Sequence, residues 1–217
     1  GEQVRAHALR LLGEPCGHDT VARFYRQWLR LEQLVGLARD PAVYPEFVAA
    51  TMPDAMLREA DRFLAELTWN EDAAVADLYT ADHTWVDQTA AALYGLSVPG
   101  DALTRVDLPP ERRGVLTLPG ILTVTSKFSQ TSPVHRGAFV IRDLLCGVLA
   151  SPPEGLNVTP PALDPTLTTR ERWAAHSSDP ACSGCHARLD PVGFALEDFD
   201  AMGRHRATEN GKPIDAS

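Results

Sequence analysis

The sequence predicts a mainly α fold, with a helical domain over residues 1–108 and a loop-rich, mostly α domain over 109–217. Two observations carry this prediction. Apolar residues recur at spacings of three and four in the first part, which is the period of an amphipathic helix. From about residue 96, proline, glycine and short β-branched runs interrupt that pattern, and helical spacing returns only in separate pieces. At 217 residues, the chain is long enough to bury a real core.

Three helices are expected in the first domain. The first covers 19–36, with Asp19 or Thr20 as N-cap and Gly36 at its end. The second begins after Thr51, and its proline lies in the first turn, where a missing N–H is harmless. The third covers "HTWVDQTAAALYG", with Gly95 as its C-terminal cap.

The second domain is predicted to hold short helices between long loops. Residues 96–120 indicate a loop with one or two short strands, and 121–137 indicate a polar loop. A helix is expected over 137–150, followed by a proline-rich extended crossing over 151–166. Two more helices are predicted, "TTRERWAAH" before the cysteine pair and "DPVGFALEDFDAMG" after it. Gly203 ends the second of these.

Charge and hydropathy argue against a nucleic-acid partner and against a membrane-spanning segment in this chain. The net charge of −9 argues against nucleic acid, because phosphate binding needs clustered Lys and Arg. No apolar run approaches the length of a membrane span, and no export signal is visible. Because the sequence opens directly on a helical pattern, we expect it to be an internal piece of a longer protein.

One short motif carries most of the functional information. Cys182, Cys185 and His186 have the spacing Cys-x-x-Cys-His, the attachment pattern of c-type haem. Two thiols at this spacing add to the two vinyl groups of the porphyrin, and the histidine then binds the iron through its imidazole. The residues between the cysteines are small, and Phe194, Leu196 and Phe199 would wall an apolar pocket.

Two other readings of the motif, besides chance, remain open at this point. A structural zinc site needs four ligands, so His176 or His205 would have to complete the pair of cysteines. A dithiol switch normally lies where a strand meets a helix, and no strand is indicated before Cys182.

The segment around the motif resembles the planctomycete-type cytochrome c-like (PSCyt) domain, a domain of unknown function. The shared pattern is CxxCH followed by DPxGFxLExFDxxGxxR, which here runs from Cys182 to Arg206. Segments 112–117, 131–146 and 169–176 also look like that family. The first half resembles the helical PSD-type domain that usually precedes it, through 24–34 and 78–95.

The resemblance implies one covalent haem c and a periplasmic or extracellular location, because haem is attached to c-type proteins outside the cytoplasm. It implies further domains of the same polypeptide or a redox partner protein, and it names no substrate. We expect electron transfer. The alternatives are a haem peroxidase or oxygenase module, and a surface-assembly module in which haem is structural.

Several other residues are candidates for the site. The sixth iron ligand is expected to be His176 in preference to Met202, with His83 and His135 as further candidates. Arg206 and its neighbour Arg204 would pair with haem propionates or stay in solvent. Cys16 and Cys146 would form a disulfide, or the second would be a buried free thiol.

Overall fold

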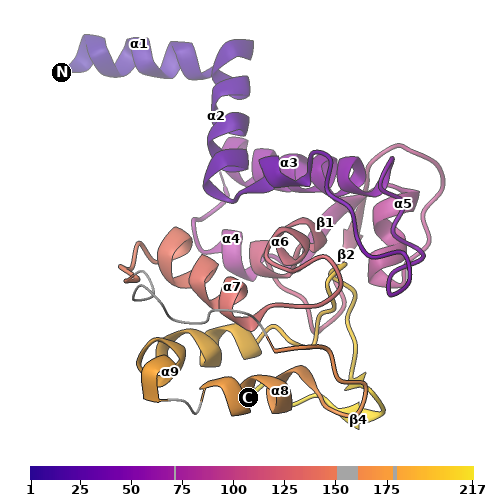
Figure 1. Ribbon diagram of the computed structural model, residues 1–217. Helices are drawn as coiled ribbons and strands as arrows, with labels where there is room; N and C mark the ends of the chain where they lie inside the picture. The colour runs from indigo at the N-terminus through magenta and orange to yellow at the C-terminus, as the bar shows by residue number, and fades with distance from the viewer. Residues whose placement is uncertain (71, 151–160, 178–179) are drawn as a thin grey trace.

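The computed structural model describes residues 1–70, 72–150, 161–177 and 180–217, without the side chains of 175, 176 and 181. The chain is mainly α, as predicted (Figure 1). Its helices are α1 (Glu2–Leu12), α2 (Pro15–Trp28), α3 (Met52–Trp69), α4 (Asp77–Thr80), α5 (Gln88–Ala91), α6 (Pro119–Val124), α7 (Pro133–Ala138), α8 (Thr169–Ser177) and α9 (Pro180–Phe194). Its shorter helical turns are η1 (Leu31–Leu34), η2 (Ala92–Tyr94), η3 (Val115–Thr117) and the π-helical η4 (Phe139–Leu144).

Two small antiparallel sheets complete the described structure. Strand β1 (His83–Val86) pairs with β2 (Thr104–Asp107), and β3 (Thr208–Glu209) pairs with β4 (Lys212–Pro213). The second pair is a hairpin whose turn residues, Asn210 and Gly211, both have positive φ. No helix of the described residues is long and apolar enough to cross a membrane.

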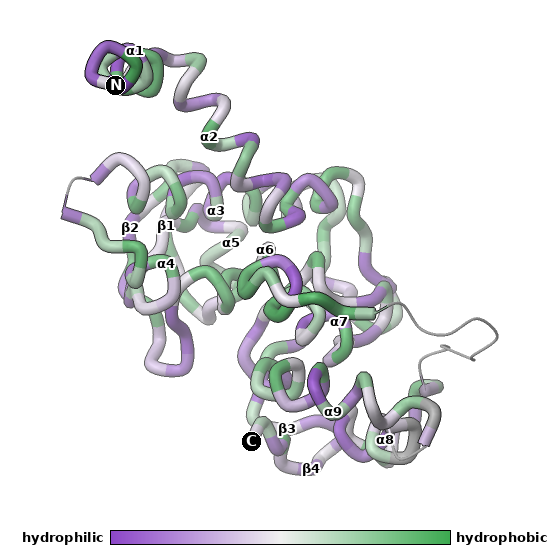
Figure 2. The backbone as a smooth tube through the Cα atoms, turned by 90° about the vertical axis from the view of Figure 1, so that its left-hand side faces the viewer, coloured by the Kyte–Doolittle hydropathy of each residue, from purple (hydrophilic) through white to green (hydrophobic). Residues whose placement is uncertain are grey.

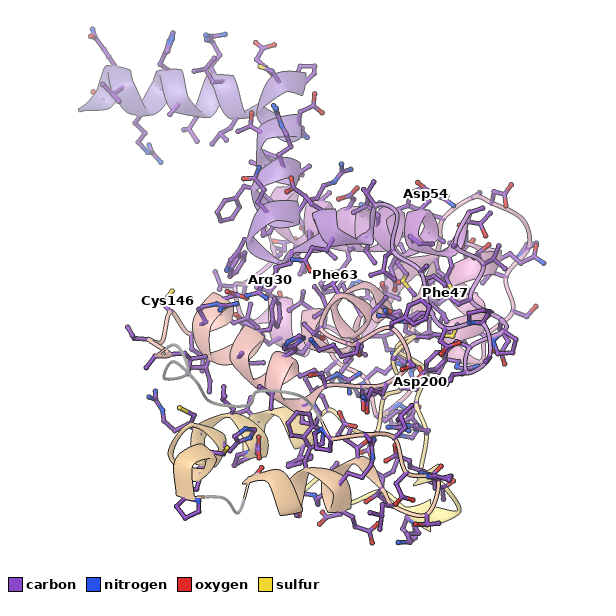
Figure 3. All side chains as sticks on the ribbon, viewed as in Figure 1. Arg30, Phe47, Asp54, Phe63, Cys146 and Asp200 are labelled. Carbon is purple, nitrogen blue, oxygen red and sulfur yellow. The ribbon has the colours of Figure 1, made fainter. Side chains whose placement is uncertain are left out.

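The core lies around α3 and draws on both halves of the chain. Met56 and Phe63 of α3 are buried together with Ile121 of α6, Phe139 of η4 and Met202 near the C-terminus. Figure 3 shows Phe63 in this central layer, and Figure 2 shows α1 and part of α2 extending away from it. Helix α1 buries none of its residues. One apolar cluster therefore joins segments on both sides of residue 108.

The first predicted helix was placed wrongly at both ends. Helix α2 begins at Pro15 and stops at Trp28, because Arg30 adopts a left-handed φ of 59°. Asp143, far along the chain, holds this break in place. Its carboxylate lies 2.6 Å from the Arg30 guanidinium, and its carbonyl accepts a 2.6 Å hydrogen bond from the Trp28 indole. The chain then turns into η1, which buries Leu31 and Leu34.

The second predicted helix is confirmed, and the third is confirmed only in its second half. Residues 83–86 form β1, where burial alternates from one residue to the next as a strand requires. The helical turn begins after Asp87, whose carboxylate caps it by accepting a 2.8 Å hydrogen bond from Ala90 N–H. Gly95 ends it in the left-handed conformation, as predicted.

A buried carboxylate connects α3 to this segment. Glu59 is fully buried and accepts hydrogen bonds from the Thr84 hydroxyl, at 2.9 Å, and from the Tyr94 hydroxyl. Burial raises the pKa of Glu59 to about 7, although both hydrogen bonds oppose the shift.

The prediction of a polar loop over 121–137 was wrong at both ends and is confirmed only for 125–132. Pro119 and Pro133 each begin a short helix, at the position where proline is favoured. The Ser132 hydroxyl caps the second of these by accepting from His135 N–H at 3.4 Å. Ser and Thr side chains in this stretch bond to backbone carbonyls within the helix, as Thr125 does to Ile121 at 2.7 Å. Their polarity is therefore satisfied locally and does not indicate a loop.

The helix predicted over 137–150 ends early, at Leu144. Cys146 has a positive φ of 54°, and Leu145 and Val148 are exposed, so the helix does not continue through this segment. Cys146 lies at the outer edge of the molecule (Figure 3). Of the predicted proline-rich crossing, 151–160 lies outside the described residues.

The last predicted helix was also wrong, because the helix lies earlier in the chain. Helix α9 ends at Phe194, and turns follow up to Gly203, which has a φ of 81°. The Asp200 carboxylate accepts hydrogen bonds from Met202 N–H at 2.8 Å and Arg204 N–H at 2.9 Å. These bonds to the side chain replace the helical ones. Phe199 and Met202 are nevertheless buried.

Candidate functional site

Helix α9 carries the whole Cys-x-x-Cys-His motif. Cys182 and Cys185 are three residues apart, so they are neighbours on successive turns of the same helix. Cys185 is exposed and Cys182 is partly exposed. Pro180 is the first residue of the helix, and Cys182 lies two residues later, in the first turn. Both thiols are therefore accessible to a reagent or cofactor from solvent.

His186 is held from its Nδ1 side. Asp190, one turn further along α9, places Oδ1 2.8 Å from the His186 Nδ1 atom. Ser177, the last residue of α8, lies 3.3 Å from the same nitrogen through its hydroxyl, and it donates to Asp190 Oδ2 at 2.6 Å. The Trp173 ring stands 5.8 Å away from the imidazole, centre to centre. With the proton on Nδ1, the lone pair is on Nε2, as a metal ligand requires.

Phe194 shares a groove with His186. The side chain is buried, and the Arg170 guanidinium stacks over its ring at 4.4 Å. The groove is open and has a volume of about 320 Å³. Its lining comes from α8, α9 and the C-terminal residue: Arg170, Ser177, Ser183, His186, Ala187, Asp190, Pro191, Phe194 and Ser217. The structure therefore groups Phe194 with the motif histidine.

Arg206 lines a different pocket. Its guanidinium lies 3.4 Å from Glu197 and 3.4 Å from Glu209, and the pocket around it also includes Arg172 and Tyr44. Arg204 is likewise engaged, with Asp200 at 2.7 Å and Glu46 at 3.3 Å. The role of Arg206 toward a cofactor stays a prediction, because its observed partners are protein carboxylates.

Two glycines let α9 lie directly against α7. A Cβ on Gly193 would meet the carbonyl oxygen of Pro133 at 1.9 Å, and one on Gly137 would meet that of Leu189 at 2.2 Å. Helices α7, α9 and α8 lie side by side in that order (Figures 1 and 2). Gly193 of the DPxGF pattern is therefore a packing residue that sets the position of the motif helix.

A buried arginine, missed at the level of sequence, fixes the chain that follows α9. Arg136 of α7 is fully buried and pairs with Glu197 at 3.1 Å. It also donates to the carbonyl oxygens of Leu196 at 2.6 Å, Phe199 at 2.9 Å and Asp200 at 3.0 Å. Burial lowers the pKa of Arg136 and raises that of Glu197, whereas their mutual attraction opposes both shifts.

Arg112 has the same kind of role closer to the core. It donates to the carbonyls of Gly203 at 2.5 Å and Thr117 at 2.8 Å, and its guanidinium lies over the Tyr94 ring at 4.4 Å. Arg112 and Arg136 both lie in segments that carry the family resemblance. Their place in those segments was the only feature of the sequence that indicated a role for them, because arginine is usually found at the surface.

The other residues predicted as iron ligands or disulfide partners lie in different parts of the structure. The side chain of His176 lies outside the described set, so its role as sixth ligand stays a prediction. Met202 is a core residue, with 1% of its surface exposed. His83 lies on β1 within 3.5 Å of Glu66. The four cysteines, all of which the structure describes, form no disulfide, and the alternative of a buried Cys146 was wrong because it is exposed.

The donor set fits a haem c. Two accessible thiols one helical turn apart stand next to an imidazole whose Nδ1 is already engaged. Among the residues described, no group of three or more His, Cys, Asp or Glu side chains is arranged to hold a metal ion. A haem iron needs no such group, since the porphyrin supplies four of its ligands and the protein supplies the axial ones.

Fold and site together define a mainly α chain whose C-terminal half presents a Cys-x-x-Cys-His motif on one helix. Residues 112–209 match the family model PSCyt3, a protein of unknown function (DUF1588), and residues 1–96 match PSD4, a protein of unknown function (DUF1592). The two matches correspond to a PSD-type domain followed by a PSCyt domain. No curated protein and no solved structure matches it.

Proposed function

We propose that the chain is the haem-carrying portion of a larger exported protein and that it transfers electrons. One haem c would be attached through Cys182 and Cys185, with His186 as an axial ligand of the iron. The observation that carries this proposal is the helix α9 itself. It places both thiols at the surface on adjacent turns and holds the next imidazole by its Nδ1 atom. The name of the PSCyt family, which suggests a cytochrome c-like domain, supports it.

When bound, the haem would supply a one-electron couple. The protein's own residues then have three tasks. The thiols would anchor the porphyrin edge, His186 would bind the iron, and Asp190 with Ser177 holds the imidazole by its Nδ1 atom. Redox partners would be further domains of the same polypeptide or a separate protein in the periplasm or at the cell surface.

The attachment is tested by three single variants expressed with a c-type maturation system. Cys182→Ala and Cys185→Ala are each expected to lose one thioether bond. The pyridine haemochrome spectrum of each variant measures this, because one vinyl group of the porphyrin then stays unmodified. Cys16→Ala is the matched control, because Cys16 is exposed on a different helix, α2, and has no partner cysteine at attachment spacing. Loss of haem in the Cys16 variant alone would contradict the assignment.

A spectrum of the loaded protein separates electron transfer from haem catalysis. A six-coordinate iron that does not react with carbon monoxide is expected for electron transfer, since both axial positions are then filled. A five-coordinate iron that binds carbon monoxide would favour the peroxidase or oxygenase alternative.

A further inference from the structure

The group that accepts the hydrogen bond from His186 Nδ1 is a carboxylate. Asp190 Oδ1 is 2.8 Å from the imidazole Nδ1, and both side chains are only 12% exposed. The second oxygen of the same carboxylate accepts the Ser177 hydroxyl at 2.6 Å. The two contacts fix the carboxylate in one orientation, in a place where solvent screens its charge less than at an open surface.

The chemical consequence depends on the kind of acceptor. An imidazole that donates its N–H to a carboxylate gains electron density at the other nitrogen, which binds the iron more strongly. The extra electron density favours the ferric state over the ferrous state, so the reduction potential falls. A neutral acceptor in the same place gives a weaker effect, because it carries no full negative charge.

We propose that Asp190 is a positioning residue that lowers the reduction potential of the iron bound by His186, by holding the Nδ1 proton on a charged oxygen. This inference rests on the proposed function, since it needs His186 as the iron ligand. It assigns a role to the first residue of the DPxGF pattern. Both carboxylate oxygens of Asp190 are used within the cluster around the imidazole.

The test compares the midpoint potentials of haem-loaded variants. Asp190→Asn keeps an oxygen acceptor of the same size and removes the charge. We expect it to retain covalent haem and to shift the ferric-to-ferrous equilibrium about tenfold toward the ferrous state, which is about 59 mV for a one-electron couple. The electron paramagnetic resonance spectrum of the ferric protein is expected to change with it, because the ligand field of the imidazole weakens.

Two further variants make the result specific. Asp198→Asn removes the same charge from the segment after α9, where Asp198 offers its backbone carbonyl to Arg206, and it is expected to shift the equilibrium less than threefold. Asp190→Glu keeps the charge and is expected to stay within threefold of the wild type. It also serves as the test if Asp190→Asn does not fold.

Three results would overturn the inference. They are an unchanged potential in loaded Asp190→Asn, an equal shift in Asp198→Asn, and a potential in Asp190→Glu as high as the one expected for Asp190→Asn. Haem content is measured before any potential. A wild-type chain without covalent haem overturns the proposed function, and with it this inference, at that earlier step. The two failures are therefore distinguishable.

Discussion

Substituting Gly193 by alanine should destabilise the chain by pushing α7 and α9 apart. The added Cβ would lie 1.9 Å from the carbonyl oxygen of Pro133 and 2.5 Å from its carbon. Carbon and oxygen normally approach no closer than about 3.3 Å, so the backbones must separate by roughly 1.4 Å. Both contacts are backbone atoms in helices, which cannot rotate away. Overpacking of this kind costs about 1–3 kcal/mol, and the better helix propensity of alanine offsets about 0.5–1 kcal/mol of it.

We therefore expect Gly193→Ala to lower the free energy of unfolding by about 1 kcal/mol, or the melting temperature by roughly 2–4 °C. The matched control is Gly184→Ala in the same helix, where a Cβ would meet nothing within 4 Å. That variant should gain about 0.5–1 kcal/mol from propensity alone. Urea and thermal unfolding of both variants, without haem, measure the difference. Equal stability of the two variants would refute the role of Gly193 in seating α9.

Two further predictions concern buried charges. Because the pKa of Glu59 is raised to about 7, the folded state keeps a proton that the unfolded state loses near pH 4.5. Stability should therefore be highest below pH 4.5 on this account and fall by about 3 kcal/mol as the pH rises to 7. Glu59→Gln should remove that slope from pH-dependent urea titrations, and an unchanged slope would contradict the assignment. Arg136→Met should cost about 3–5 kcal/mol in the same assay because it removes the fully buried guanidinium that pairs with the buried Glu197. Arg142→Met, where the arginine side chain is 51% exposed, should cost at most about 1 kcal/mol. Equal costs for the two variants would contradict a stabilising role of the buried Arg136.

The sequence predicted the helical class and α3 because periodicity, a cap position and a proline in the first turn agree there. It missed the end of α2, since nothing local to Arg30 shows that Asp143 will hold the break from far along the chain. It took 83–86 as helical because the partner strand lies about twenty residues further on. Both errors come from contacts distant in sequence, which periodicity does not contain.

The sequence indicated the cysteines and the histidine of the candidate site, but not the residues that hold them in position. Cys182, Cys185 and His186 follow from spacing alone. In the sequence, Asp190 stood out only as the aspartate of the DPxGF pattern. Its hydrogen bond to His186 depends on both residues lying one turn apart on α9. The Asn-Gly pair at 210–211 is a standard hairpin signal and would have predicted the β3–β4 turn.

The intact mass of the denatured chain, produced with a c-type maturation system, shows whether haem is covalently attached. Haem that is only coordinated is released by denaturation, whereas haem bound through two thioethers stays with the polypeptide. We predict a mass higher than that of the polypeptide by one haem, located by digestion on the peptide that contains Cys182 and Cys185. A chain that has the mass of the polypeptide alone would contradict the account.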